Sequence, residues 1–145
     1  MLMTGHAFQV FIENDELRAS LAAVHAALGE RGRFAFESRN PLVREWERWT
    51  PQPAVEVTDA SGAAIGMEQR VEAVEGDRLS FTLTYSSAAW SEPRVSRSVL
   101  RFLDAATLAS FLAAAGFAIE EQFGDWDGQP FAATSREIIT IARRR

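Results

Sequence analysis

A strict alternation of apolar and polar side chains over residues 79–86 constrains the fold more than any other feature of this sequence. Four serine and threonine residues alternate there with Leu79, Phe81, Leu83 and Tyr85. A period of two residues is typical of a β-strand with one buried face and one face in water. Strands of this kind occur in antiparallel sheets, so the middle of the chain is predicted to be an antiparallel meander.

Turn signals divide the rest of this region into further strands. A hairpin is predicted from strands at 55–59 and 65–71, joined by the turn Ala60-Ser61-Gly62. A second turn, Glu75-Gly76-Asp77, leads into the alternating strand, and residues 95–102 are predicted to form a fourth strand.

Helical periodicity appears on both sides of the meander. Apolar residues recur at spacings of four and three in Leu17, Leu21, Val24 and Leu28. Asn14 is the predicted N-cap of this first helix, and Gly29 or Gly32 is its predicted end. A second helix is predicted between Asp104 as N-cap and Gly116 as the glycine that follows its C-cap.

Short apolar strands flank these helices. They are predicted at 33–38, 117–123 and 137–142. The order strand, helix, strand at the start of the chain indicates one step of a parallel α/β sheet. The 145 residues leave room for one domain. We therefore predict an α/β core formed by 1–41 and 101–145, interrupted by an antiparallel β insertion at 42–100.

The composition excludes several classes of chemistry and of partner. There is no cysteine, which excludes disulfides, thiolate zinc sites and cysteine nucleophiles. All 15 basic residues are arginine, which excludes lysine Schiff bases and Walker-type phosphate loops. The net charge of −5 lacks the basic footprint of a nucleic-acid-binding protein. Neither a membrane span nor a signal-peptide pattern is present, so we expect a cytoplasmic protein.

Acid–base candidates are few. His6 and His25 are the only histidines, and His25 is predicted to lie on the flank of the first helix, at its surface or boundary. His6 follows Gly5 at the end of a predicted strand, where ligands of α/β sheets bind. His6 is therefore the candidate catalytic residue, and the alternative interpretation is a hydrogen-bonded loop residue.

Two further groups have a functional and a structural interpretation. Trp46 and Trp49 follow a strand end, and they either line a substrate site or pack the meander against the main sheet. The Asp-Trp-Asp-Gly segment at 125–128 superficially suggests calcium. It lacks the remaining ligands of a calcium loop, so we interpret it as a turn and predict no metal site.

Four segments carry a resemblance to a known family. Residues 1–9 contain a strand end followed by a loop, and residues 28–37 contain Leu-Gly-Glu-Arg-Gly leading into a strand. Residues 101–117 end in Ala-Gly-Phe, and residues 137–144 form the last predicted strand. In this order they resemble the C-terminal half of a class I S-adenosylmethionine-dependent methyltransferase. The first two segments resemble that fold's strand four with its active-site loop and its L-x-P-G-G-x turn into strand five. The last two resemble its A-G-F entry to strand six and its strand seven.

The resemblance implies a partial Rossmann-like sheet with mixed strands in the order 4-5-7-6. The insertion resembles the antiparallel one that several small-molecule methyltransferases carry after strand five. The Gly-rich loop, the acidic residue and the adenine loop that hold the family's cofactor would lie upstream of Met1. Binding of S-adenosylmethionine by this chain alone is therefore expected to be negligible.

The resemblance also implies roles for individual residues. His6 would be the general base for a hydroxyl or amine acceptor. Contacts to the cofactor are expected from Thr4, Gly5 and Phe8. Contacts to the substrate are expected from Gln9, Asn40, Trp46 and Trp49.

Two functions from different classes fit these features. The first is the substrate-side half of a small-molecule methyltransferase, which is active only together with an upstream half. The second is a non-catalytic domain that forms a homodimer and binds a hydrophobic small molecule under the meander. The DNA upstream of Met1 would discriminate between them, because an in-frame segment encoding a Gly-rich loop favours the first.

Overall fold

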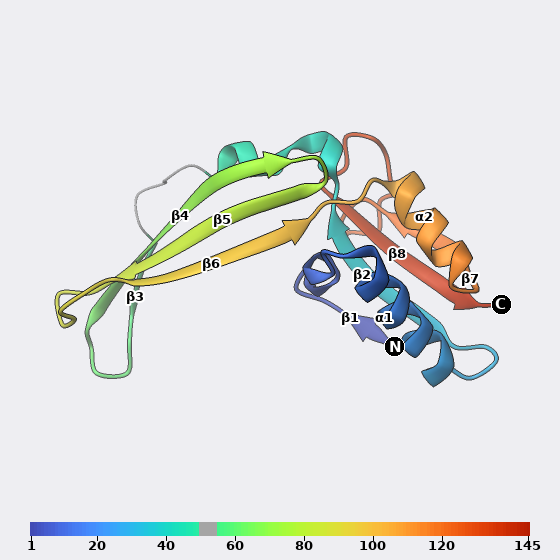
Figure 1. The fold of residues 1–145 in the computed structure, drawn as a ribbon, viewed down its shortest axis with the longest axis horizontal. Helices are drawn as coiled ribbons and strands as arrows, with labels where there is room; N and C mark the ends of the chain where they lie inside the picture. The colour runs from blue at the N-terminus through green and yellow to red at the C-terminus, as the bar shows by residue number, and fades with distance from the viewer. Residues whose placement is uncertain (50–54) are drawn as a thin grey trace. The chain divides into compact units, whose positions relative to one another are not determined.

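The computed structural model describes residues 1–49 and 55–145 (Figure 1). The described chain divides into two compact units, one formed by residues 1–44 and 100–145 and the other by residues 45–99. The first unit is a mixed sheet with two α-helices, and the second is an antiparallel sheet. The predicted α/β class is therefore confirmed.

The first unit is built on a four-stranded sheet with the order β1-β2-β8-β7. These strands are β1 (Leu2–Met3), β2 (Arg33–Arg39), β8 (Glu137–Arg144) and β7 (Phe117–Phe123). Strand β1 is parallel to β2, whereas β8 is antiparallel to both β2 and β7. This is the predicted 4-5-7-6 order, with β8, the last strand of the chain, inserted between β2 and β7.

Helices α1 (Asn14–Ala27) and α2 (Ala105–Ala114) cover one face of this sheet (Figure 1). Successive strand residues point to opposite faces, and Phe34 and Phe36 of β2 point to the helices. The core between helices and sheet consists of Phe8, Leu17, Leu21, Leu28, Phe34, Phe36, Leu103, Leu108, Leu112, Phe117 and Ala142. Neither helix, nor any other helix in the described ranges, is long and apolar enough to cross a bilayer.

The predicted caps are confirmed for α2, whereas the predicted N-cap of α1 is wrong. The predicted N-cap Asn14 is wrong by one residue, because Glu13 caps α1 through a capping box with Glu16. A glutamate is an uncommon N-cap, which is why the asparagine beside it was the stronger signal. Asp104 caps α2 as predicted and accepts a hydrogen bond from the Thr107 N–H at 2.7 Å. Gly116 follows α2 with a φ of 84°, a conformation that favours glycine.

The second unit is the predicted meander. Its strands β3 (Val55–Thr58), β4 (Ala64–Glu75), β5 (Arg78–Ser86) and β6 (Arg94–Arg101) lie side by side in chain order. Strand β4 is longer than predicted and contains a β-bulge between Val71 and Ala73. The first turn is held by Asp59, whose carboxylate accepts hydrogen bonds from the Ser61 N–H, the Ser61 hydroxyl and the Ala63 N–H.

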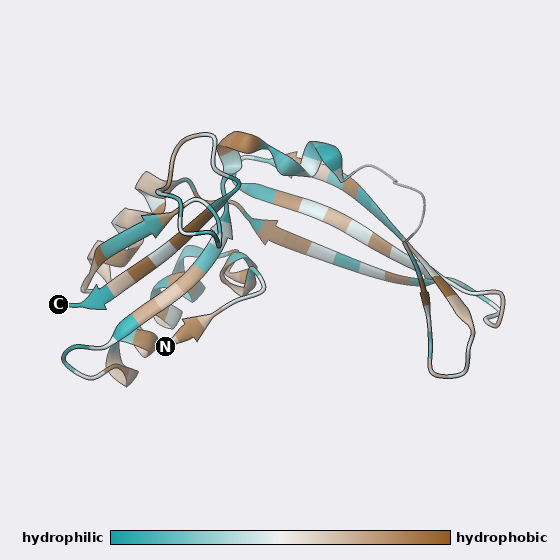
Figure 2. Ribbon diagram, turned by 180° about the vertical axis from the view of Figure 1, so that it is seen from behind, coloured by the Kyte–Doolittle hydropathy of each residue, from teal (hydrophilic) through white to brown (hydrophobic). Residues whose placement is uncertain are grey.

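The helix-free face of the first sheet is apolar at its centre, around Ala35 and Ile141, and carries the charged pair Arg33 and Arg143 at one end. Figure 2, turned by 180° from Figure 1, shows the strands of this unit from the side opposite to α1 and α2. A hollow of about 260 Å³ on this unit is lined mainly by Leu2, Ala35, Phe36, Phe123, Trp126, Ile139 and Ile141. Leu2 and Trp126 are 67% and 62% exposed. Parallel strands are usually covered on both faces, so this surface differs from that of a complete doubly wound sheet.

Candidate active site

His6 stands on a strained turn directly after β1. Gly5 and His6 have φ values of 73° and 56°, and His6 is the N-cap of the 3-10 helix η1 (Ala7–Val10). A left-handed conformation costs a non-glycine residue about 1–2 kcal/mol. Backbone strain of this kind occurs often at functional sites. The position of His6 is therefore maintained by contacts elsewhere in the fold.

Two carboxylates from neighbouring strands hold His6. The backbone N–H of His6 donates to Oε1 of Glu37 on β2 at 2.8 Å. The ring Nε2 of His6 lies 3.0 and 3.1 Å from the two carboxylate oxygens of Glu137, the first residue of β8. The side chains of His6 and Glu137 are 25% and 14% exposed. The contact between the two side chains is thus partly shielded from water.

The contact with Glu137 selects one form of the imidazole ring. An ionised carboxylate can only accept hydrogen bonds, so Nε2 of His6 must carry a proton to bond Glu137. In the neutral ring Nδ1 is then the acceptor. The geometry therefore leaves Nδ1 of His6 as the basic nitrogen. The negative charge of Glu137 would stabilise the imidazolium that forms when Nδ1 accepts a proton.

Glu37 is the most deeply buried acidic residue of this group. It is 3% exposed, and among the described residues its Oε2 has no hydrogen-bond partner. Burying a carboxylate with an unpaired oxygen costs free energy, and such sites tend to be functional. Sequence reasoning missed both Glu37 and Glu137, because each looked like an ordinary strand residue.

The predicted substrate residues Gln9 and Asn40 have amides that bind the surrounding chain. Gln9 is 1% exposed; its amide donates to the Arg101 carbonyl at 3.1 Å, and its oxygen accepts from Nη1 of Arg39 at 3.0 Å. Asn40 is equally buried and donates to the carbonyls of Ala133 and Ser135 at 3.0 and 2.8 Å. Both residues fix loops at the end of β2.

The predicted cofactor residues have different environments. Phe8 is 4% exposed, and its ring stacks on Phe36 with centroids 4.2 Å apart. Thr4 and Gly5 are exposed, and a Cβ added at Gly5 would meet no atom within 4 Å. The space around this turn is therefore open, whereas the Phe8 side chain belongs to the core.

The two tryptophans belong to the 45–99 unit. Trp46, in the 3-10 helix η3 (Glu45–Arg48), is 9% exposed. The Trp49 ring lies edge-on to Phe81 of β5, with centroids 5.8 Å apart. The substrate role predicted for these residues stays a prediction, and the structure adds that Trp49 packs on an aromatic residue of the meander.

The remaining candidates are the 125–128 segment and His25. At 125–128, the carboxylates of Asp125 and Asp127 accept hydrogen bonds from the backbone N–H groups of Trp126 and Gln129, as in a turn. Within residues 1–49 and 55–145, no three His, Asp or Glu side chains are arranged to hold a metal ion. His25 lies against Phe117, and its buried Nε2 has no partner in the described chain.

Comparisons with known proteins give a match at the level of structure alone. No family profile matches this sequence, and no curated protein sequence matches it. A methyltransferase from Clostridium acetobutylicum that depends on S-adenosylmethionine has 13% identity and a TM-score of 0.75. The CcbJ methyltransferase from Streptomyces caelestis has 16% identity and a TM-score of 0.74. An amino pentose methyltransferase from Micromonospora echinaspora, bound to S-adenosylmethionine and involved in calicheamicin biosynthesis, has 19% identity and a TM-score of 0.63.

These matches cover nearly all of this chain but only part of each methyltransferase. They extend over 99% of the chain and over 56%, 55% and 58% of the three solved proteins, respectively. The chain thus has the fold of slightly more than half of a methyltransferase that depends on S-adenosylmethionine, consistent with the C-terminal half that the sequence resembles. At this level of identity the likeness shows the fold.

Proposed function

We propose that this chain is the substrate-side half of a small-molecule methyltransferase that depends on S-adenosylmethionine, with His6 as its general base. The observation that carries the proposal is the His6–Glu137 pair at the end of β1, on a fold shared with methyltransferases. Ligands of open α/β sheets bind at the carboxyl ends of strands, which is where the turn at His6 lies.

Methyl transfer requires the acceptor to lose a proton. When a hydroxyl or ammonium group becomes a nucleophile, its proton would pass to Nδ1 of His6. The imidazolium formed in this way would be stabilised by the carboxylate of Glu137, 3.0 Å from Nε2. Glu37 would position His6, because the hydrogen bond that its carboxylate accepts from the His6 N–H helps to hold the left-handed turn. His6 is thus the catalytic residue and both glutamates are positioning residues.

The cofactor, S-adenosylmethionine, would supply an electrophilic methyl group when bound. The residues of this chain fit only one side of such a molecule. Thr4 and Gly5 lie on an exposed turn with open space around Gly5, so their backbone could approach it. The Phe8 ring is engaged in the core. We therefore propose that the remaining contacts come from an upstream half.

The acceptor is proposed to be a small molecule. The solved proteins that resemble this chain include an amino pentose methyltransferase, which acts on a sugar that carries an amine. An amine or hydroxyl acceptor suits a site with a histidine base. A cytoplasmic location belongs to the same proposal.

The decisive experiment is to express the complete reading frame around this segment. If the DNA upstream of Met1 encodes an in-frame Gly-rich loop, the complete protein should transfer methyl groups, and His6→Gln should lower the rate of transfer far more than it lowers the cofactor affinity. Glu75→Gln, at an exposed position of β4 in the other unit, is the matched control and should leave activity unchanged. Full activity of His6→Gln would exclude the proposed base.

A second candidate function is supported by the apolar helix-free face. In the described sheet, strand β1 is an edge strand that pairs with β2. Its exposed residue Leu2 lines the hollow at β1, β2 and β8. Unpaired strand edges and exposed apolar surfaces favour association with another chain. On this alternative the chain is a non-catalytic domain that forms a homodimer, and the hollow accepts a hydrophobic small molecule. A stop codon directly upstream of Met1 would favour it.

A further inference from the structure

The hollow on the helix-free face of the first sheet is lined from one side of its strands. In the strand pairing Leu2 is opposite Ala35, Ala35 is opposite Ile141, and Phe123 is opposite Ile139. Residues that are opposite each other, or two apart along one strand, point to the same face. These five apolar side chains therefore share one surface at the hollow of about 260 Å³. Figure 2 shows this face, with brown, hydrophobic segments along β8.

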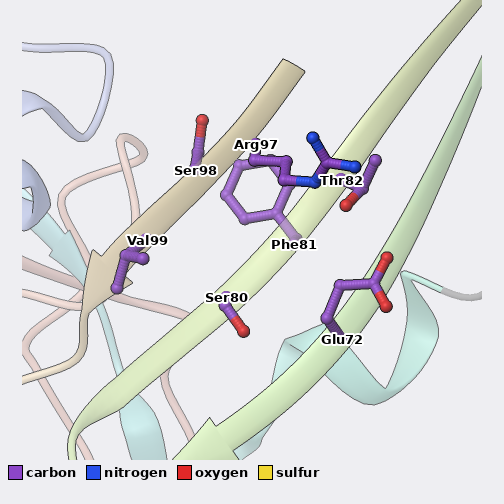
Figure 3. A pocket seen from close by; sticks show the side chains of 7 residues that line it. All are labelled: Glu72, Ser80, Phe81, Thr82, Arg97, Ser98 and Val99. Carbon is purple, nitrogen blue, oxygen red and sulfur yellow. The ribbon is translucent and has the colours of Figure 1, made fainter. Parts of the chain in front are cut away.

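The hollow on the antiparallel unit lacks such a common surface. It has a volume of about 550 Å³ and lies on β4, β5 and β6 (Figure 3). Ser80 and Phe81 are neighbours on β5, and Arg97 and Ser98 are neighbours on β6, so the members of each pair point to opposite faces. A ligand in one concavity cannot contact both sets of side chains.

The loop that follows β7 adds an aromatic ring and a carboxylate to the apolar surface of the first unit. Asp125 and Trp126 both line its hollow. Trp126 is 62% exposed, so much of this side chain is accessible to a ligand. Oδ1 of Asp125 accepts a hydrogen bond from the Trp126 N–H at 2.7 Å. The other oxygen of Asp125 has no partner within the described chain, so it can bind a ligand.

The charged groups of this face favour a cation in the hollow. Arg33 and Arg143 are opposite each other where β2 begins, and both bind the carboxylate of Glu120. Asp125 lies at the other end of the sheet, where β7 ends, and forms no ion pair in the described chain. Glu37 points to the same face near this end, and its buried Oε2 has no partner among the described residues. The available charge beside the hollow is therefore negative.

We infer that this hollow binds a quaternary ammonium ion with an apolar body. The cation would lie against the Trp126 ring, whose face attracts positive charge, with the Asp125 carboxylate as its counter-ion. The apolar body would pack on Ala35, Ile139 and Ile141. A quaternary ammonium group has no N–H to satisfy, which suits a lining that offers a single carboxylate. The inference rests on the second candidate function, in which the hollow accepts a hydrophobic small molecule, and it names the chemical class of that molecule.

The test uses the full chain and three probes that share a benzyl group. Benzyltrimethylammonium is a cation, benzyl alcohol is neutral and phenylacetate is an anion. Chemical-shift changes in NMR spectra of the protein give the dissociation constants and locate the site. We expect the cation to bind about three- to tenfold more tightly than the alcohol, and phenylacetate to bind most weakly. The largest shift changes should occur in β2, β8 and residues 125–128.

Variants identify the groups that recognise the cation. Asp125→Asn should weaken the binding of the cation about two- to fivefold and that of benzyl alcohol less than about twofold, because asparagine keeps an oxygen for the Trp126 N–H but loses the charge. Asp127→Asn is the matched control, since it changes the net charge equally in a side chain that does not line the hollow. Trp126→Leu should weaken the binding of the cation more than that of the alcohol. Circular dichroism checks that each variant retains its fold.

Three results would overturn the inference, and they separate it from the function on which it rests. Binding of benzyl alcohol in the hollow without a preference for the cation would exclude the inference and leave the second candidate function intact. Absence of binding of all three probes at millimolar concentration would exclude both. Equal weakening by Asp125→Asn and Asp127→Asn would show attraction to the negative charge of the whole protein instead of this site.

Discussion

Glu137 lies 131 residues after His6 in the sequence, and its carboxylate is 3.0 Å from Nε2 of the His6 ring. The contact forms because β8 returns to the centre of the sheet, next to the strand that follows His6. It combines a strained turn, a base and a counter-charge in one place. The first prediction tests this relationship directly.

We expect Glu137→Gln to change the protonation pattern of the His6 ring. In the unmodified protein the neutral ring should carry its proton on Nε2, which two-dimensional NMR of the ring nitrogens detects. A glutamine amide can donate as well as accept, so the variant should contain a larger fraction of the Nδ1-protonated form. His6→Gln assigns the signal against that of His25. A proton on Nδ1 in the unmodified protein would contradict the proposed base.

S-adenosylmethionine should bind this chain by itself negligibly. The chain offers one exposed turn, Thr4-Gly5, whereas the resemblance implies that a Gly-rich loop, an acidic residue and an adenine loop upstream of Met1 supply the other contacts to the cofactor. Isothermal titration calorimetry should show no saturable heat with the cofactor or its demethylated product. A dissociation constant of about ten micromolar, roughly 7 kcal/mol, would show instead that the described residues form a complete cofactor site. In that case His6→Ala and Phe8→Ala should weaken the binding.

Phe8→Ala should destabilise the protein by about 3–5 kcal/mol in urea unfolding, because it leaves a cavity beside Phe36 in the core. Leu42→Ala is the matched control, since Leu42 is 65% exposed and lies outside the hollow, and it should change stability by less than about 0.5 kcal/mol. Equal effects of the two substitutions would mean that Phe8 is not part of the core. The experiment thereby separates a packing role from a ligand contact.

The β3–β4 turn should weaken in acid. Hydrogen bonds from the Ser61 side chain and from the backbone of Ala63 and Ser61 lower the pKa of Asp59 below its usual 3.8. A carboxyl whose folded pKa is depressed stabilises the turn above the unfolded pKa, and this contribution is lost as the pH falls through the folded pKa. Hydrogen exchange at the Ala63 N–H should accelerate in that range. Asp59→Asn should remove the pH dependence; an unchanged profile in this variant would assign the effect to another group.

The helix-free face should make the chain self-associate at micromolar concentration. A twofold dimer is the simplest closed arrangement, because it uses one surface twice. Sedimentation equilibrium should give twice the monomer mass of 16.1 kDa. Leu2→Glu should shift the equilibrium toward monomer, whereas Val95→Glu, at an exposed position of the other unit, should not. A monodisperse monomer of the unmodified chain would exclude this mode of association.

Local sequence patterns were sufficient to predict most of the elements. The period of two at residues 79–86 and the spacing of leucines from Leu17 to Leu28 reflect which side of a strand or helix is buried, and this depends on neighbouring residues alone. Asp104 and Gly116 were recognised for the same reason, since capping satisfies backbone groups within one turn. The order of the four strands came from the resemblance to methyltransferases, and the structure confirms it.

Long-range pairing decided the chemistry of the candidate site. Glu37 and Glu137 carry no local signal that separates them from other strand glutamates, and they become partners of His6 only when β1, β2 and β8 assemble. Phe8 and Gln9 lie two and three residues after His6, so the sequence favoured ligand contacts for them, but η1 turns both side chains into the interior. The sequence determined by itself which segments are strands and helices, because that depends on local periodicity. Only the tertiary structure decided which nitrogen of His6 is free, because that depends on a contact across 131 residues.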